Sequence, residues 1–174
     1  ANPDMVVKYV QMFGEALARK VDSDIFTQIS YMSEAKVLAT DDIMVHGELE
    51  DILATLGEND VDYTAGDVYF VVNPTLMANL LNPSSGLAKY FLRNDASAGG
   101  TGLVMSNSFT TGGNDTISGA IFHKSAVACA VQQDVRVQNE YSIDALGTKV
   151  VADMIYGVKV LDDSDNIRGI RIKN

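Results

Sequence analysis

Apolar residues recur every three to four positions near the start of the chain. This spacing places them on one face of a helix of about seven turns. Asn2-Pro3 is a favourable start, because asparagine caps helices and proline suits the first helical position. The pattern predicts one long amphipathic helix from Asn2 to about Ser30, either an ordinary surface helix or one that also touches a neighbouring subunit. The apolar stripe consists of Val6, Tyr9, Val10, Phe13, Leu17, Val21 and Ile25.

Two shorter helices are expected in the middle of the chain. The first runs from His46 to Leu56, and Gly57 is its expected stop. The second runs from Thr75 to Leu81, between Asn73-Pro74 and Asn82-Pro83. The second proline ends it, because the residue before a proline disfavours the helical conformation.

Two strands are expected around a polar loop. Val68–Val72 is a continuous apolar run, which is typical of a strand buried on both faces. Arg93–Gly102 is polar and rich in glycine, which indicates a loop. Leu103–Met105 after it is a second short strand.

From Thr116 onward the pattern predicts mostly strand. Val135 and Val137 alternate with polar residues, as in a half-exposed strand. Ser142–Gly147 is the expected turn between two long strands. Asp162–Asn166 is an expected hairpin turn, since Asp and Asn suit turn geometry. The fold class is therefore α+β.

Composition and charge narrow the function. The chain has 174 residues, of which 47% are hydrophobic, enough for one domain or two small lobes with a real core. Its net charge of −10 argues against a general nucleic-acid binder, which would show a basic face. Cys129 excludes an internal disulfide framework and is expected to be a small core residue. No apolar run approaches the ~20 residues of a membrane span, so no membrane partner is expected.

The histidines do not predict a catalytic or metal site. His46, Glu48 and Glu50 are expected to point in different directions from a solvated first helical turn, where acids are favoured. His123 is expected in mid-strand, roughly 20 Å from Cys129 at ~3.3 Å per residue. A nucleophile and its base must lie within ~3 Å, so the two do not form a pair by local geometry.

Other candidate motifs are also weak. Asp162–Asn166 lacks the glycine and glutamate of a calcium loop. Gly99–Gly102 has neither the spacing of a dinucleotide site nor the Lys-Ser/Thr of a phosphate loop. Ser84, Ser85, Ser106 and Ser108 have no base nearby in sequence, although a distant base stays open. We therefore predict no catalytic residue, no metal and no cofactor, and a protein that is not an enzyme.

The order of segments resembles the major capsid protein of tailed bacteriophages, whose fold is shared with encapsulins. The helix from Asn2 to about Ser30 resembles that family's long spine helix. Asp67–Leu81 and Gly102–Ser108 resemble strands and a helix of its axial domain. Gly119–Ile172 resembles a strand leaving that domain, a long peripheral hairpin and a return strand.

The resemblance implies a fold and its domains. We expect a long spine helix, a peripheral-domain antiparallel hairpin and a mixed axial-domain sheet flanked by helices. Residues 1–42 would hold the spine helix and the start of the peripheral domain. Residues 43–131 would form the axial domain, 132–157 the peripheral hairpin and 158–174 the returning axial strand. In that family an N-terminal arm and an extended loop precede the spine helix, where this sequence begins. Some capsids of the family form a Lys–Asn crosslink whose lysine lies in the extended loop. No crosslink is therefore expected here.

The resemblance also implies function and partners. The chain would form the icosahedral head shell of a tailed phage around its DNA, as pentamers and hexamers in the virion, assembled in the host cytoplasm. A scaffold or decoration protein and packaged DNA, bound without sequence specificity, are further expected partners. The alternatives are an encapsulin-type shell protein and a small hydrolase using His123 or His46. The implied inter-subunit contacts are Arg93, Asn94 and Asp95 near a capsomer axis, and Tyr141, Ile143 and Asp144 near a three-fold contact.

Overall fold

The computed structural model describes residues 3–39, 43–63, 66–82, 87, 102–109, 117–143, 147–161 and 165–174. Its centre is a five-stranded sheet with the strand order β1-β7-β4-β2-β3. β4 is antiparallel to its neighbours β2 and β7, whereas the outer pairs β1–β7 and β2–β3 are parallel. The sheet is mixed, and the α+β class is confirmed. The strands are β1 (Glu34–Val37), β2 (Val68–Val72), β3 (Gly102–Met105), β4 (Ile117–His123) and β7 (Gly169–Lys173).

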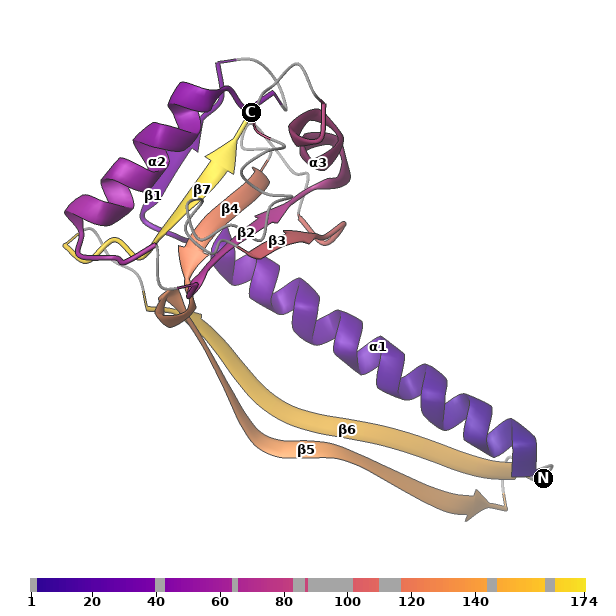
Figure 1. The fold of residues 1–174 in the computed structure, drawn as a ribbon. Coiled ribbons are helices and arrows are strands. Elements are labelled where there is room, and N and C mark those ends of the chain that lie inside the picture. The colour runs from indigo at the N-terminus through magenta and orange to yellow at the C-terminus, as the bar shows by residue number, and fades with distance from the viewer. Residues whose placement is uncertain are drawn as a thin grey trace.

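Helices α2 (His46–Glu58) and α3 (Pro74–Leu80) cover one face of this sheet, as Figure 1 shows. Their apolar side chains share one core with the strand residues that point to the same face. Burial of this apolar surface is the main force that holds both helices on the sheet. The largest fully buried side chains of this core are Met44, Ile52, Leu56, Phe70, Leu76, Leu80, Leu87, Ile121 and Ile172.

The opposite face of the sheet receives the C-terminal end of α1 (Pro3–Ile29). Ile29 packs there in a second cluster with Val71 and Ala120. The guanidinium of Arg171 donates a hydrogen bond to the carbonyl oxygen of Ser30, just beyond the end of α1, where a helix favours positive charge. β2 therefore has apolar layers on both faces, as its continuous apolar run predicts, and only its Tyr69 is exposed.

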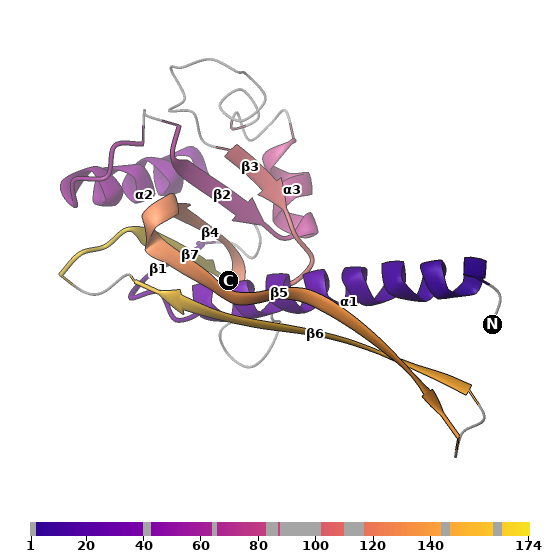
Figure 2. The same ribbon diagram turned by 90° about the horizontal axis from the view of Figure 1, so that it is seen from below.

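An antiparallel hairpin of two long strands projects from the sheet beside α1. Its strands are β5 (Val127–Ser142) and β6 (Gly147–Val160), which pair with each other and with no other strand of the described segments. Figures 1 and 2 both show α1 and the hairpin running out from the same side of the sheet. We call α1 residues 7–28 together with the hairpin the extension, and the five-stranded sheet with α2 and α3 the body. Every described residue of the extension is exposed or half-buried, so the extension has no core of its own.

The helix predictions are confirmed with small shifts at the ends. The first helix ends at Ile29. The second continues through Gly57 to Glu58, so the expected stop at Gly57 is wrong. Asn59 is its C-cap, followed by Asp60 with a φ of 59°, which Asp tolerates. The third helix begins one residue early, at Pro74, because the Asn73 side chain accepts a hydrogen bond from the Leu76 N–H at 2.6 Å.

Three predictions about the strands are corrected. The strand expected through His123 and Lys124 is broken, because β4 ends at His123 and a 3-10 turn, Lys124–Ala126, leads into β5. Cys129 is exposed rather than a core residue, because it lies on β5, where every residue from Cys129 to Tyr141 except Gln133 is exposed. Val135 and Val137 lie on the same strand and are 43% and 40% exposed, so the expected buried side of a half-exposed strand is absent there.

The expected hairpin turn at Asp162–Asn166 is not one. Its residues 162–164 lie outside the described residues, but the strands on either side belong to different sheets. β6 pairs with β5, whereas β7 pairs with β4 and β1. β1 is a further difference, because it places residues 34–37, expected in the peripheral part, inside the five-stranded sheet.

Gly119 is expected to tolerate no side chain. A Cβ added there would lie 2.8 Å from the Val71 carbonyl oxygen, a backbone atom that cannot swing away. We expect Gly119→Ala to lower the free energy of unfolding by about 1–3 kcal/mol, measured by urea denaturation. Gly157→Ala is the control, since a Cβ there meets nothing within 4 Å. Equal stability of the two variants would contradict the close approach of β2 and β4.

Candidate functional site

The two faces of the hairpin differ in exposure. Along β6 the even-numbered residues from Val150 to Val160 are half-buried, whereas the odd-numbered residues are exposed except for Asp153. α1 contacts both β5 and β6, and Tyr156 bonds to it. The even-numbered residues therefore form an inner face toward α1, and the odd-numbered residues form an outer face toward solvent.

A polar latch joins α1 to the inner face. The Tyr156 hydroxyl donates to Asp24 Oδ2 at 2.6 Å, and Lys20 Nζ donates to Asp24 Oδ1 at 2.5 Å. The hydrogen bond from Lys20, followed by that from Tyr156, lowers the pKa of the Asp24 carboxyl. The hydrogen bond to Asp24 is the largest cause that raises the pKa of Tyr156, from 10.0 to about 12. The latch is thus formed by ionised Asp24 and neutral Tyr156.

The latch predicts a change at alkaline pH. Because the pKa of Tyr156 is raised in the folded chain, its contribution to stability is complete below pH 10 and is lost as the pH rises through about 12. We expect the tyrosinate absorbance that disappears in Tyr156→Phe to titrate near pH 12. In Asp24→Asn, which removes the negative charge, Tyr156 should titrate closer to 10. A Tyr156 signal that titrates near 10 in the unaltered chain would contradict the latch.

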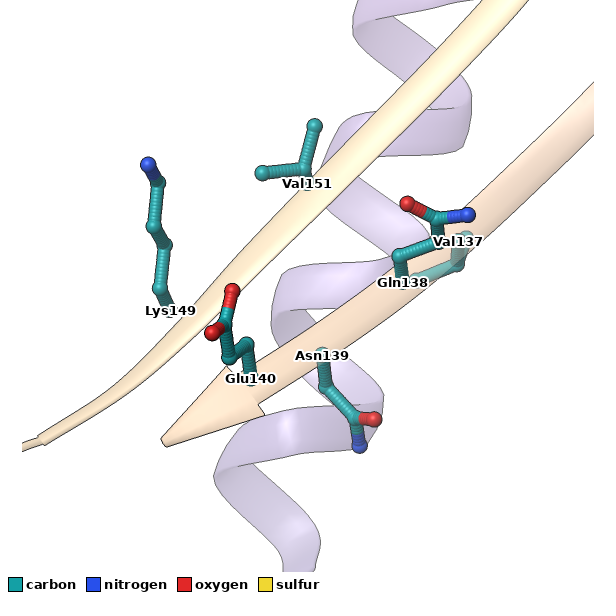
Figure 3. A pocket seen from close by; sticks show the side chains of 6 residues that line it. All are labelled: Val137, Gln138, Asn139, Glu140, Lys149 and Val151. Carbon is teal, nitrogen blue, oxygen red and sulfur yellow. The ribbon is translucent and has the colours of Figure 1, made fainter. Parts of the chain in front are cut away.

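A hollow of about 580 Å³ lies near the tip of the hairpin, shown in Figure 3. Residues from both strands line it, and α1 passes behind them in this view. Glu140 on β5 lies opposite Lys149 on β6, so these two ionisable residues of the hollow are cross-strand neighbours of opposite charge. Such a pair stabilises a hairpin and does not by itself form a catalytic site. The lining residues are Val137, Gln138, Asn139, Glu140, Lys149 and Val151.

The extension carries more than half of the exposed large apolar side chains among the described residues. They occur on α1 and on both strands, so apolar atoms face solvent on several sides. A helix that is apolar on several sides is typically covered by other protein. These residues are Val7, Tyr9, Val10, Met12, Val131, Val135, Val137, Tyr141, Ile143, Val151 and Ile155.

Two of the six predicted contact residues lie on this surface. Tyr141 and Ile143 are at the tip of the hairpin and are 62% and 77% exposed. Arg93, Asn94, Asp95 and Asp144 lie outside the described residues. Whether any of the six contacts another subunit stays a prediction.

Of the three polar residues at the start of α2, His46, Glu48 and Glu50, only Glu48 points away from the other two. Glu48 points back to the preceding loop, where its carboxylate accepts hydrogen bonds from the N–H groups of Ala39 and Val45. His46 Nδ1, however, lies 3.0 Å from Glu50 Oε1, so the expectation that these two point apart is wrong. They lie one helical turn apart and are therefore neighbours. Within the described ranges, no group of three His, Cys, Asp or Glu residues could hold a metal ion.

His123 has a polar neighbour that the sequence analysis missed. Its Nδ1 lies 2.8 Å from Ser125 Oγ and accepts a hydrogen bond from the Ser125 N–H at 3.2 Å. Arg168 donates to the same Oγ at 2.7 Å. The imidazole therefore caps the 3-10 turn after β4 in the way that a polar side chain caps a helix, and this accounts for its position structurally.

None of the helices in the described segments is long and apolar enough to cross a membrane.

Solved structures that this chain resembles include chains from two phages and from a virus-like particle. A structure from Mycobacterium phage Che8 matches with a TM-score of 0.69 at 22% identity, over 94% of this chain and 61% of that one. The capsid of Cyanophage P-SCSP1u matches with a TM-score of 0.61 at 19% identity, over 96% and 65% of the two chains. The virus-like particle from Pyrococcus furiosus gives 0.58 at 20%, over 91% and 63%. The fold is the tailed-phage capsid fold, and the chain spans less than two thirds of each of these proteins.

The sequence identifies the family. The model of the family described as phage capsid protein matches residues 1–170. The chain therefore belongs to the phage capsid protein family, and the resemblance in the order of segments is confirmed. No curated protein sequence matches the chain.

Proposed function

We propose that this chain is the structural subunit of an icosahedral head shell, a major capsid protein that encloses the DNA of a tailed phage in the virion. The extension is the feature that best supports this proposal. It is long, it exposes many large apolar side chains, and none of its described residues is buried. An isolated two-stranded hairpin is marginally stable in water. Contacts with other copies would cover this surface and stabilise it.

The fold also suggests how the chain divides its work. The body would be the axial domain, around the axis of a pentamer or hexamer, with Arg93, Asn94 and Asp95 near that axis. The extension would be the peripheral domain, with Tyr141, Ile143 and Asp144 at a contact between capsomers. Because β1 pairs with β7, the boundary that the sequence placed at residue 42 would fall between the end of α1 and Glu34. Each contact can be weak, because a shell repeats it many times.

The protein would not be an enzyme, and it would need no cofactor. The family to which the chain belongs supports this, as does the structural role of His123 as a cap. A scaffold or decoration protein, packaged DNA and assembly in the host cytoplasm complete the proposed setting. The similarity to a virus-like particle favours an encapsulin-type shell as the second candidate. DNA inside purified shells would favour the phage head, and an enclosed enzyme would favour the encapsulin.

The tip of the hairpin provides the test. The double variant Tyr141→Asp, Ile143→Asp replaces two exposed side chains, so the melting temperature should change little. Two charges at a contact that every subunit repeats should weaken each contact about tenfold, ~1.4 kcal/mol, and lower the yield of shells by more than that factor. Leu161→Asp is the control, since Leu161 is also exposed, at 55%, but follows β6 at the opposite end of the hairpin. Normal shell yield from the tip variant would show that the tip makes no such contact.

A further inference from the structure

Two extra residues interrupt the pairing of β5 with β6. Val131 lies opposite Tyr156, and Arg136 lies opposite Asp153. β5 therefore advances five residues (136 − 131) while β6 advances three (156 − 153), and the two register shifts fall on either side of Gln133. Each extra residue is a bulge, which bends a strand and increases its local twist. Figure 1 shows the hairpin bending in its middle part.

The pair of bulges preserves the faces of the hairpin. One extra residue would move every later side chain of β5 to the opposite face. The second restores the alternation, so Val131 and Val137 both lie opposite inner-face residues, Tyr156 and Ala152. The two insertions thus redirect the outer half of the hairpin without exchanging its inner and outer faces.

One carboxylate bridges the bulged segment. Asp153 accepts two hydrogen bonds from Arg136, Nε to Oδ1 at 3.1 Å and Nη2 to Oδ2 at 2.8 Å. Gln133 Nε2 donates to the same Oδ2 at 3.0 Å. Asp153 is also the one odd-numbered residue of β6 from Lys149 to Lys159 that is half-buried rather than exposed. The paired hydrogen bonds fix the guanidinium and the carboxylate in one plane, which a single contact cannot do.

The latch to α1 does not reach this part of the hairpin. Tyr156 lies opposite Val131, on the body side of both bulges. The latch therefore does not fix the direction of the outer half, and the bulges, where the hairpin bends, lie between the latch and the tip. Hydrogen bonding to Arg136 lowers the pKa of Asp153, and the pKa of Arg136 is raised in turn, so both groups stay charged at neutral pH.

We propose that Asp153 is the positioning residue that fixes the direction of the hairpin tip, and with it the angle at which a second copy of the chain meets Tyr141 and Ile143. The first part, the direction of the tip, does not depend on the proposed function. The second part, the angle at which another copy meets the tip, rests on it. Without the Asp153 carboxylate, the outer half of the hairpin samples several directions while the inner half stays latched to α1.

Distances between spin labels on the unassembled protein test the first part. In a Cys129→Ser background, Glu58→Cys labels the body and Thr148→Cys labels the tip, both at exposed positions. We expect one narrow distance distribution, which Asp153→Asn replaces with a broad one. The exchange Arg136→Asp, Asp153→Arg restores the pair with reversed charges and should restore the narrow distribution. A tip distribution that Asp153→Asn leaves unchanged would overturn the proposal.

A second label pair separates a local effect from loss of the fold. Glu58→Cys with Lys159→Cys places the second label on β6 near the body, where the distribution should stay narrow in Asp153→Asn. Broadening at both positions would overturn the proposal, because Asp153 would then hold the whole extension. Electron microscopy tests the second part: we expect Asp153→Asn to lose shells of uniform size, and unaltered shells would reject it. Absence of shells from the unaltered protein would reject the proposed function and leave the spin-label result standing.

Discussion

Replacement of Val71 with aspartate is expected to lower the free energy of unfolding by several kcal/mol. Val71 is 6% exposed on β2, within the cluster that also contains Ile29 and Ala120. A carboxylate there would lie between the sheet and the end of α1, surrounded by apolar side chains. An unpaired buried charge typically costs about 3–5 kcal/mol. Denaturant unfolding followed by circular dichroism measures the loss.

The neighbouring residue supplies the control. Tyr69 precedes Val71 by two residues, points to the same face of β2 and is 40% exposed. Tyr69→Asp places the same charge where water can reach it, so the expected loss is much smaller. Similar stabilities of Val71→Asp and Tyr69→Asp would show that α1 does not seal this face of the sheet.

The second large effect is expected at Glu48, which is buried at 8% exposure near the start of α2. Its carboxylate accepts the N–H of Ala39 at 2.8 Å and the N–H of Val45 at 2.9 Å. It therefore ties two separate points of the connection between β1 and α2 to the helix. Glu48→Ala leaves both donors without this acceptor, at about 1–3 kcal/mol each, so we expect a total loss of about 2–6 kcal/mol.

Glu50→Ala is the matched control for this prediction. Glu50 is on the same helix two residues later, and its side chain is 67% exposed and contacts His46. Loss of an exposed pair of this kind costs about 0.3–0.5 kcal/mol. Thermal unfolding of the two variants side by side distinguishes a burial effect from a general preference of this helix for acids. A smaller loss in Glu48→Ala than in Glu50→Ala would contradict the role of Glu48.

The elements that the sequence predicts well are those with a strong local signal. The apolar stripe from Tyr9 to Ile25 repeats long enough to leave no alternative to a helix, and Asn73-Pro74 marks the start of α3. The continuous apolar run of β2 correctly indicates burial on both faces. β1 gives no comparable signal, because it has four residues, two of them charged, and is recognised only by its pairing with β7.

The candidate site depends on contacts that sequence spacing does not reveal. The latch joins Asp24 and Tyr156, which are 132 residues apart. The bulges occur at Gln133 and its neighbours, where no glycine or proline marks an irregular strand. Cys129 illustrates the reverse error: the alanines and valines around it indicate a core, but every residue of β5 from Cys129 to Tyr141 except Gln133 is exposed.

Electron microscopy of the unaltered full-length protein tests the central claim most directly. If the extension is covered by other copies of the chain, the purified protein will form uniform closed shells. If the protein gives only small discrete particles, alone and with any scaffold protein encoded beside it, the exposed apolar surface of the extension serves another purpose and the shell function is wrong.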